Sequence, residues 1–218
     1  MLSIDFHLSE KVTPHILCLG AHSDDIEIGA LATILSFADR HPEAHIDWVV
    51  FSATGSRRAE ATDSAEYCTR GYRDANVQIN EFQDGHFPMQ AGAIKAEFES
   101  LKARCEPDLI LTHYRHDRHQ DHAVISDLTW QTFRNHLILE YETPKYDGDL
   151  GIPNLFNAVA QTLADQKIAV LDQFFVTQQK KSWFDPETFS ALMRLRGIEC
   201  HSESGYAEAF HCRKLLLR

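Results

Sequence analysis

Two patterns of hydrophobic and polar positions alternate along most of the chain. Short apolar runs of strand length recur, and each is followed by a longer stretch with apolar residues at helical spacing. The first run, 15–20, is apolar almost throughout, which is typical of a parallel strand covered on both faces. Strands are predicted at 15–20, 46–51, 77–82, 108–112 and 137–141, with helices at 26–38, 59–69, 91–105 and 123–133. This alternation predicts an α/β fold, with a Rossmann-like three-layer arrangement around a mostly parallel sheet.

The composition of the chain changes after residue 143, where Pro and Gly become frequent. A short strand, two helices and a closing strand or hairpin are predicted there, at 155–159, 162–175, 186–195 and 205–217. We expect this C-terminal extension to help shape a substrate pocket. Residues 1–14 are expected to form an N-terminal arm. Because no repeat or linker-like segment interrupts the pattern, a single domain over residues 1–218 is predicted.

The composition and net charge of the chain disfavour some classes of binding partner. The 218 residues carry a formal net charge of −11, which argues against a nucleic-acid partner or an anionic membrane surface. No apolar stretch approaches the roughly 18 residues of a membrane span. The five cysteines are an odd number without a CxxC pair, and they are expected to be reduced thiols. The first residues lack the apolar core of a signal peptide, so a cytoplasmic location is expected.

Candidate chemistry begins at the turn that follows the first strand. His22, Asp24 and Asp25 lie there, just before the first helix. Open α/β sheets bind their ligands at the carboxyl ends of the strands. Adjacent Asp residues at this place are also typical of a helix N-cap. Since Gly20 and Gly29 do not make a GxGxxG fingerprint, a dinucleotide cofactor is not expected.

A second polar cluster follows the strand predicted at 108–112. Four histidines recur there at every third residue: His113, His116, His119 and His122. Two strand ends that both carry His and Asp can converge on one metal ion. Two imidazoles and one carboxylate leave a position open for water on Zn²⁺, which is the ligand count of a hydrolytic site. Of the two neighbouring carboxylates, Asp24 and Asp25, one can bind the metal while the other acts as a base.

These two clusters resemble the motifs of the PIG-L/LmbE-like family of zinc-dependent N-acetylglucosaminyl deacetylases. The family's first motif usually reads AHPDDE, whereas this chain has Ser23 in place of Pro and Ile26 between Asp25 and Glu27. The family's second motif matches residues 119–122, which read His-Gln-Asp-His. Further matching stretches are Thr54-Gly55-Ser56-Arg57 with Glu60-Ala61, Asp84-Gly85, and Tyr206-Ala207-Glu208-Ala209-Phe210. Some members carry a Tyr where this chain has Asp117, and Tyr114 is a nearby substitute.

The resemblance implies a role for each matching residue. His22, Asp25 and His122 would bind the metal. Asp24 would be the general base, and His119 the charged partner of the oxyanion or the acid for the leaving amine. Asp121 would orient a neighbouring histidine. The substrate-binding residues would be Arg57, Asp84, Tyr206 and Glu208. Zn²⁺ is the expected cofactor, and Fe²⁺ or another divalent ion suits the same ligands.

The function expected from this resemblance is metal-dependent removal of an N-acetyl group from a small-molecule amino sugar or glycoconjugate. Three alternatives remain. The chain can be a catalytically impaired relative that binds metal or sugar, or an amidase that acts on another N-acyl substrate. A non-haem Fe(II) oxygenase uses similar ligands, but the alternation of strands and helices disfavours it. The oligomeric state is left open, a homo-oligomer included, and Trp48, Trp130 and Trp183 are expected in the core.

Overall fold

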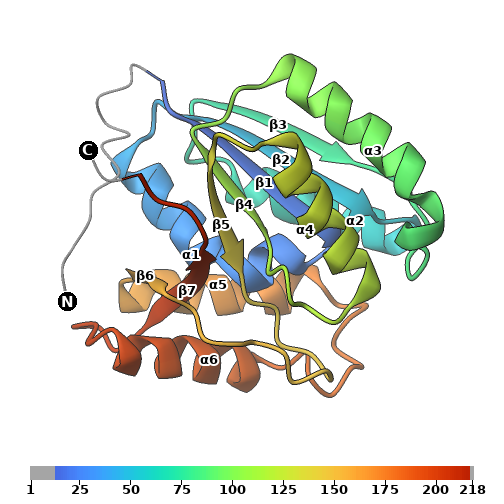
Figure 1. The fold of residues 1–218 in the computed structure, drawn as a ribbon. Coiled ribbons are helices and arrows are strands. Elements are labelled where there is room, and N and C mark those ends of the chain that lie inside the picture. Colours follow the sequence, from blue (N-terminus) through green and yellow to red (C-terminus); the bar gives the residue numbers. More distant parts are fainter. Residues whose placement is uncertain (1–12, 217–218) are drawn as a thin grey trace.

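A seven-stranded sheet forms the centre of the computed structural model, which describes residues 13–216 (Figure 1). Most of the expected N-terminal arm therefore lies outside the described residues. The strand order is β3-β2-β1-β4-β5-β7-β6. The strands are β1 (His15–His22), β2 (His45–Ser52), β3 (Asp74–Ile79), β4 (Leu109–His113), β5 (Leu137–Tyr141), β6 (Leu155–Ala158) and β7 (Ala207–Cys212). Strands β1 to β5 pair in parallel, and β7 runs antiparallel to both β5 and β6. The predicted mostly parallel α/β fold is confirmed.

Helices cover both faces of the sheet (Figure 1). They are α1 (Asp25–Arg40), α2 (Gly55–Cys68), α3 (Phe87–Arg104), α4 (Gln120–Thr132), α5 (Gln161–Phe174) and α6 (Pro186–Glu199). Because successive strand residues point to opposite faces, β1 contributes Ile16 and Cys18 to the core under α1 and α2, and Leu17 and Leu19 to the core under α3 and α4. This explains the near-continuous apolar run of β1. None of the helices in residues 13–216 combines the length and apolar character needed to cross a bilayer.

The segment after residue 143 completes the sheet and adds a further layer. Strands β7 and β6 extend the sheet beyond β5, while α5 packs against α1 and α6 packs against β7 (Figure 1). Helix α6 continues to Glu199, beyond the predicted end at residue 195. The predicted closing strand is a single strand, β7, which ends at Cys212.

Two buried side chains from this segment bind the main chain in the middle of α1. The ammonium of Lys167 donates to the carbonyl of Ile28 at 2.6 Å and to Glu208 Oε1 at 2.6 Å. The Glu208 carboxylate accepts from the N–H groups of Ala32 at 3.0 Å and Thr33 at 2.7 Å. The Ile28 carbonyl and the Ala32 N–H are the groups that bond to each other in a regular α-helix. The helix that begins at Asp25 is therefore held by residues from α5 and β7.

Candidate metal centre

A cavity of about 250 Å³ lies at the carboxyl ends of β1 and β4, which are neighbours in the sheet. Seven of the residues singled out from the sequence line it: His22, Asp24, Asp25, Arg57, Asp84, His119 and His122. The loop after β5 and the segment between α5 and α6 add Thr143, Lys145, Tyr146, Asp147, Lys181 and Trp183. The segments that follow the first four strands, β1 to β4, and two later loops thus build one cavity.

Three donor atoms converge beside this cavity. Nδ1 of His22 lies 3.2 Å from Nε2 of His122 and 3.4 Å from Oδ2 of Asp25, and Nε2 of His122 lies 3.5 Å from Oδ1 of Asp25. Exposed fractions are 6% for His22 and 3% for each of the other two. Ligands about 2.0–2.1 Å from a tetrahedral Zn²⁺ are roughly 3.3 Å apart. The three distances are close to this value, with a different oxygen of Asp25 facing each histidine.

Hydrogen bonds at the far side of each ring set the tautomers of the two histidines. Nε2 of His22 faces Asp84 Oδ1 at 3.1 Å and Asp121 Oδ2 at 3.2 Å. Nδ1 of His122 faces Asp117 Oδ2 at 2.8 Å. Because carboxylates only accept, these nitrogens carry the protons, and the inner nitrogens are left with lone pairs. Two nitrogen lone pairs and the Asp25 carboxylate then meet with no proton between them, an arrangement that a bound cation stabilises.

The pKa shifts of His22 and Asp25 also favour a bound cation. Burial opposes protonation of His22, yet hydrogen bonds to Asp121, Asp25 and Asp84 raise its pKa well above the usual value. Burial disfavours the Asp25 anion, but His122 and His113 hold its pKa well below the usual value. The cluster therefore attracts positive charge, which a divalent ion supplies as well as a proton does. The donor set of two imidazoles and one carboxylate fits a divalent transition-metal ion.

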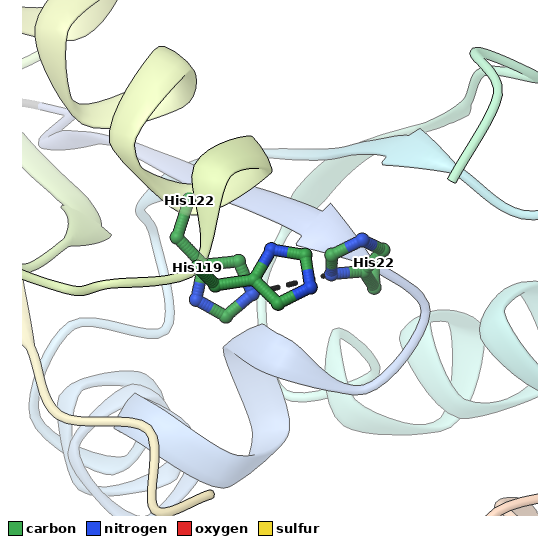
Figure 2. A group of neighbouring side chains, drawn as sticks. All are labelled: His22, His119 and His122. Carbon is green, nitrogen blue, oxygen red and sulfur yellow. Dashed lines mark hydrogen bonds between the residues drawn. The ribbon is translucent and has the colours of Figure 1, made fainter. Parts of the chain in front are cut away.

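Figure 2 shows the third imidazole, His119, beside those of His22 and His122. His119 precedes α4 as its N-cap, and its Nδ1 accepts the Asp121 N–H at 3.3 Å. Burial and the nearby His22 lower the pKa of His119, which favours the neutral ring. In that tautomer Nε2 carries the proton. One nitrogen from each of the three rings lies within 4.8 Å of the others.

Asp24 lies in the same turn but faces a different neighbour. It is buried, and its Oδ1 lies 3.8 Å from NH2 of Arg57. Burial and the charge of Asp25 raise the pKa of Asp24, while Arg57 opposes that rise. The hydroxyl of Ser23 donates to Asp24 at 3.4 Å and accepts from Nε of Arg57 at 3.2 Å. Ser23, which replaces the usual Pro, thus links the carboxylate to the arginine.

Three predicted site residues remain: Asp121, Tyr206 and Glu208. Asp121 lies against the cluster, since it accepts from the N–H groups of Gly85 at 2.6 Å and Phe87 at 3.0 Å and contacts His22. Tyr206 and Glu208 are not among the residues that line the cavity. Glu208 binds the main chain of α1, as described above, and Tyr206 packs near Met193. Their predicted contact with substrate has no support from these positions.

Several residues at the site had no assigned role in the sequence-based prediction. Lys145 forms an ion pair with Asp117 at 2.9 Å and thereby supports the ring of His122. His113 is buried behind Asp25, accepts the Ala21 N–H at 2.9 Å, and has its pKa lowered to about 4 by burial and His122. Trp183, expected in the core, is partly buried and lines the cavity. The substitute considered for the family Tyr, Tyr114, stacks on His211 instead.

A model of the PIG-L family, described as GlcNAc-PI de-N-acetylase, matches residues 17–133, which is more than half of the chain. The chain belongs to the PIG-L family. The family resemblance inferred from the two motifs is confirmed.

Solved structures share the fold at low sequence identity. GalB, the 4-carboxy-2-hydroxymuconate hydratase from Pseudomonas putida KT2440, is 18% identical over 94% of this chain and 98% of its own, with a TM-score of 0.73. The N,N'-diacetylchitobiose deacetylase from Pyrococcus horikoshii is 18% identical over 96% of this chain and 87% of its own, with a TM-score of 0.67. The zinc-inhibited form of teicoplanin deacetylase Orf2 is 13% identical over 90% of this chain and 96% of its own, with a TM-score of 0.70. These likenesses show a common fold.

Proposed function

We propose that this protein is a metal-dependent hydrolase that removes the N-acetyl group from an amino sugar or a small glycoconjugate. The observation that carries the proposal is the convergence of His22, Asp25 and His122, with the carboxylate of Asp24 lining the same cavity. Membership of the PIG-L family supports an acyl-amide substrate. The diacetylchitobiose and teicoplanin deacetylases of the same fold support a sugar-bearing one.

His22, Asp25 and His122 are the residues that would hold the metal. Zn²⁺ is the ion that these ligands favour, and Fe²⁺ or another divalent ion also suits them. When bound, the ion polarises a carbonyl group and makes water a stronger nucleophile near neutral pH. Asp117 and Asp121 hold the two imidazoles with their lone pairs directed at that point. A rigid ligand set of this kind spares reorganisation during the reaction.

Asp24 is the proposed general base. Its raised pKa makes it a stronger proton acceptor than an ordinary aspartate, because burial and Asp25 both disfavour its charge. Arg57 keeps it ionised and holds it in place through Ser23. Amide hydrolysis requires removal of a proton from the attacking water, and we assign this role to Asp24, which lines the cavity.

His119 is the proposed donor to the substrate. An amide also needs a hydrogen-bond donor for its developing oxyanion, and its leaving nitrogen needs a proton, which Asp24 can return after taking it from water. Because Nδ1 of His119 is used in capping α4, the Nε2–H is available to the cavity. The lowered pKa of His119 favours a neutral hydrogen-bond donor over a permanently charged one.

The rim of the cavity supports a small polar substrate. Its volume of about 250 Å³ is slightly below the usual range for drug-sized ligands, which suits a single sugar unit. Trp183 provides an aromatic surface, and the ammonium of Lys181 lies 5.3 Å from the centre of its ring. Asp84 is half exposed and pairs with Arg57 at 2.7 Å, and it is the proposed partner of sugar hydroxyls.

A second candidate function is addition of water to a carbon–carbon double bond of an unsaturated polycarboxylate, the type of reaction that the hydratase GalB is named for. The observation that favours it is Lys181, an exposed cation at the rim that suits an anionic substrate. Both reactions require an activated water molecule beside a base. The two candidate functions would use the same metal cluster and differ in their substrates.

The decisive experiment measures acetate release from a panel of free and nucleotide-linked N-acetylated sugars, with Asp24→Ala assayed in parallel. Protein loaded with one equivalent of Zn²⁺ or Fe²⁺ is compared with protein in excess metal, because a zinc-inhibited form of a deacetylase with this fold is known. Acetate release that Asp24→Ala abolishes supports the proposal. Loss of ultraviolet absorbance from an unsaturated dicarboxylate, without acetate release, supports the hydratase. Tight binding of metal and sugar with neither reaction supports a catalytically impaired binding protein.

A further inference from the structure

A second cluster of histidines and carboxylates lies at the opposite end of the sheet. His15 and His45 are the first residues of β1 and β2 and are register partners, and Asp74 begins β3 as the register partner of His45. Asp47 follows His45 by two residues, so both side chains point to the same face of the sheet. The seven residue steps from His15 to His22 place this cluster roughly 23 Å from the candidate metal centre.

Three donor atoms meet within this cluster. Oδ2 of Asp47 lies 2.7 Å from Nε2 of His15 and 3.3 Å from Nε2 of His45. The two imidazole rings meet edge to face, with their centres 4.5 Å apart. One atom from each residue lies within 4.8 Å of the others. Two imidazole nitrogens and one carboxylate oxygen are the same donor set that the candidate metal centre contains.

Two of the three residues, His45 and Asp47, are also held from behind. Nδ1 of His45 lies 3.0 Å from Oδ2 of Asp74, which orients the ring with Nε2 toward Asp47. The second oxygen of Asp47 accepts from Asn76 Nδ2 at 2.7 Å and lies 3.4 Å from NH1 of Arg104. Metal-binding histidines usually donate their second ring N–H to a carboxylate, and metal-binding carboxylates are themselves hydrogen-bonded. Both kinds of support are present here.

The solvent exposure and the net charge of this second cluster are compatible with binding of a cation. Asp47 is buried, while the side chains of His15 and His45 are 18% and 24% exposed, so the donors are reachable from solvent at one edge. The carboxylates of Asp47 and Asp74 exceed the single positive charge of Arg104. A simple ion-pair cluster explains the contact of each ring with Asp47. It does not require the additional carboxylate of Asp74, which directs Nε2 of His45 toward Asp47.

We propose that His15, His45 and Asp47 form a second binding site for a divalent transition-metal ion, with Asp74 positioning His45. Imidazole and carboxylate ligands suit Zn²⁺ best among common ions, and Co²⁺ is its spectroscopic substitute. A bound ion would join the beginnings of β1 and β2, which are adjacent in the sheet. Because binding to the folded state stabilises it, such an ion would raise the unfolding temperature without contacting the catalytic cavity.

Zinc stoichiometry in four proteins tests this proposal separately from the proposed function. They are the wild type, His45→Gln, His22→Gln/His122→Gln, and the protein with all three changes. The expected zinc contents after dialysis are about two, one, one and zero equivalents, in that order. About one, one, zero and zero equivalents would overturn the second site and leave the first. About one, zero, one and zero equivalents would support the second site and refute the metal centre of the proposed function. Circular dichroism of each metal-free protein shows whether it is folded.

A milder substitution keeps the test valid if His45→Gln fails to fold. Asp74→Asn removes the supporting carboxylate and is expected to weaken Zn²⁺ binding at this site about tenfold. Glu43→Gln removes an equal charge from the same end of the sheet, where Glu43 lies near His41 rather than the cluster. It is the matched control and should leave the affinity unchanged. Equal effects of the two substitutions, or a Co²⁺ absorption spectrum unaffected by Asp74→Asn, would overturn the proposal.

Discussion

Oδ2 of Asp117 lies 2.8 Å from Nδ1 of His122, on the side of the ring away from Asp25. This contact leaves Nε2 of His122 without a proton and directs it at the cluster. Burial opposes the charge of Asp117, but His122 and Lys145 hold the pKa of this carboxyl well below its usual value. Asp117 is thus an anion near neutral pH, which favours a single tautomer of His122.

Replacement of Asp117 by Asn is therefore expected to weaken metal binding. The amide oxygen still accepts a hydrogen bond from His122, but the negative charge that makes the imidazole a stronger ligand is lost, so affinity should fall about 10- to 100-fold. Competition with a chromogenic chelator measures this. Asp147→Asn, an exposed aspartate at the same cavity, is the matched control. If both variants bind metal as tightly as the wild type, Asp117 has no such role.

Substitutions of Asp24 and His122 should distinguish a loss of catalysis from a loss of metal binding. Asp24→Ala removes the proposed base without removing a ligand, so it should retain stoichiometric metal while turnover falls about 10²- to 10⁴-fold. His122→Ala removes a ligand and should lose metal and turnover together. Metal analysis of the purified variants, with acetate release in parallel, tests both expectations. Equal loss of metal in the two variants would contradict the role of Asp24 as a base, and full zinc content in His122→Ala would contradict its role as a ligand.

The arginine next to Asp24 should control the acid side of the pH profile. Activity is expected to rise with pH as Asp24 loses its proton. Arg57 favours the ionised carboxylate, so Arg57→Gln raises the pKa of Asp24 and shifts the acid limb to higher pH. The measurement is kcat/KM against pH. Arg58→Gln is the control, because Arg58 points to Glu81 rather than the cavity. A lower rate in Arg57→Gln with an unmoved acid limb would assign Arg57 to substrate binding alone.

The buried Glu27 should make stability fall with rising pH. Burial is the main reason that its pKa is raised to about 8, and Ser64 donates to its Oε1 at 2.5 Å. Between its ordinary pKa of 4.5 and about 8, the folded state keeps a proton that the unfolded state has released. The free energy of unfolding should therefore decrease by up to about 1.4 kcal/mol per pH unit across this window and level off above it.

Glu27→Gln should remove that slope, since an amide does not titrate. Urea unfolding at several pH values between 6 and 9 compares the variant with the wild type. The difference in stability should grow in favour of Glu27→Gln as pH rises. Glu66→Gln changes an exposed glutamate on α2 and should leave the slope as it is in the wild type. Parallel curves for wild type and Glu27→Gln would mean that Glu27 is already ionised in the folded protein.

The fold was largely predictable because its signal is local. Each strand from β1 to β5 is an apolar run, and each helix has its own spacing, so the alternation alone indicates a parallel sheet. The observed boundaries of the elements differ from the predicted ones by a few residues. Helix α2, for example, begins at Gly55 rather than at residue 59. The antiparallel pairing of β7 between β5 and β6 was not readable, because it depends on long-range contacts that no local pattern encodes.

The residues of the site were predictable where they follow a strand. His22 and Asp25 end one strand and begin its helix, so the topology alone places them near His122. Lys145 and Lys181 come from loops whose paths depend on tertiary packing, and nothing in their neighbours' spacing marks them. The same limit applies to His15 and His45, which become a cluster only through the register of two strands. Glu208 illustrates a different limit, because a matching motif does not distinguish a residue that binds substrate from one that binds a helix.

The bonds from Lys167 and Glu208 to α1 also bear on how the protein is made. The ribosome releases α1 long before α5 and β7, so the middle of the helix that carries Asp25 lacks these partners until most of the chain has emerged. Residues 17–133, which match the family model, contain the three ligands but neither of these two partners. A nascent chain of that length would have its ligands in place along the sequence and still lack the anchors of α1. Acquisition of metal is thereby expected to be a late event of biosynthesis, after the last strand has joined the sheet.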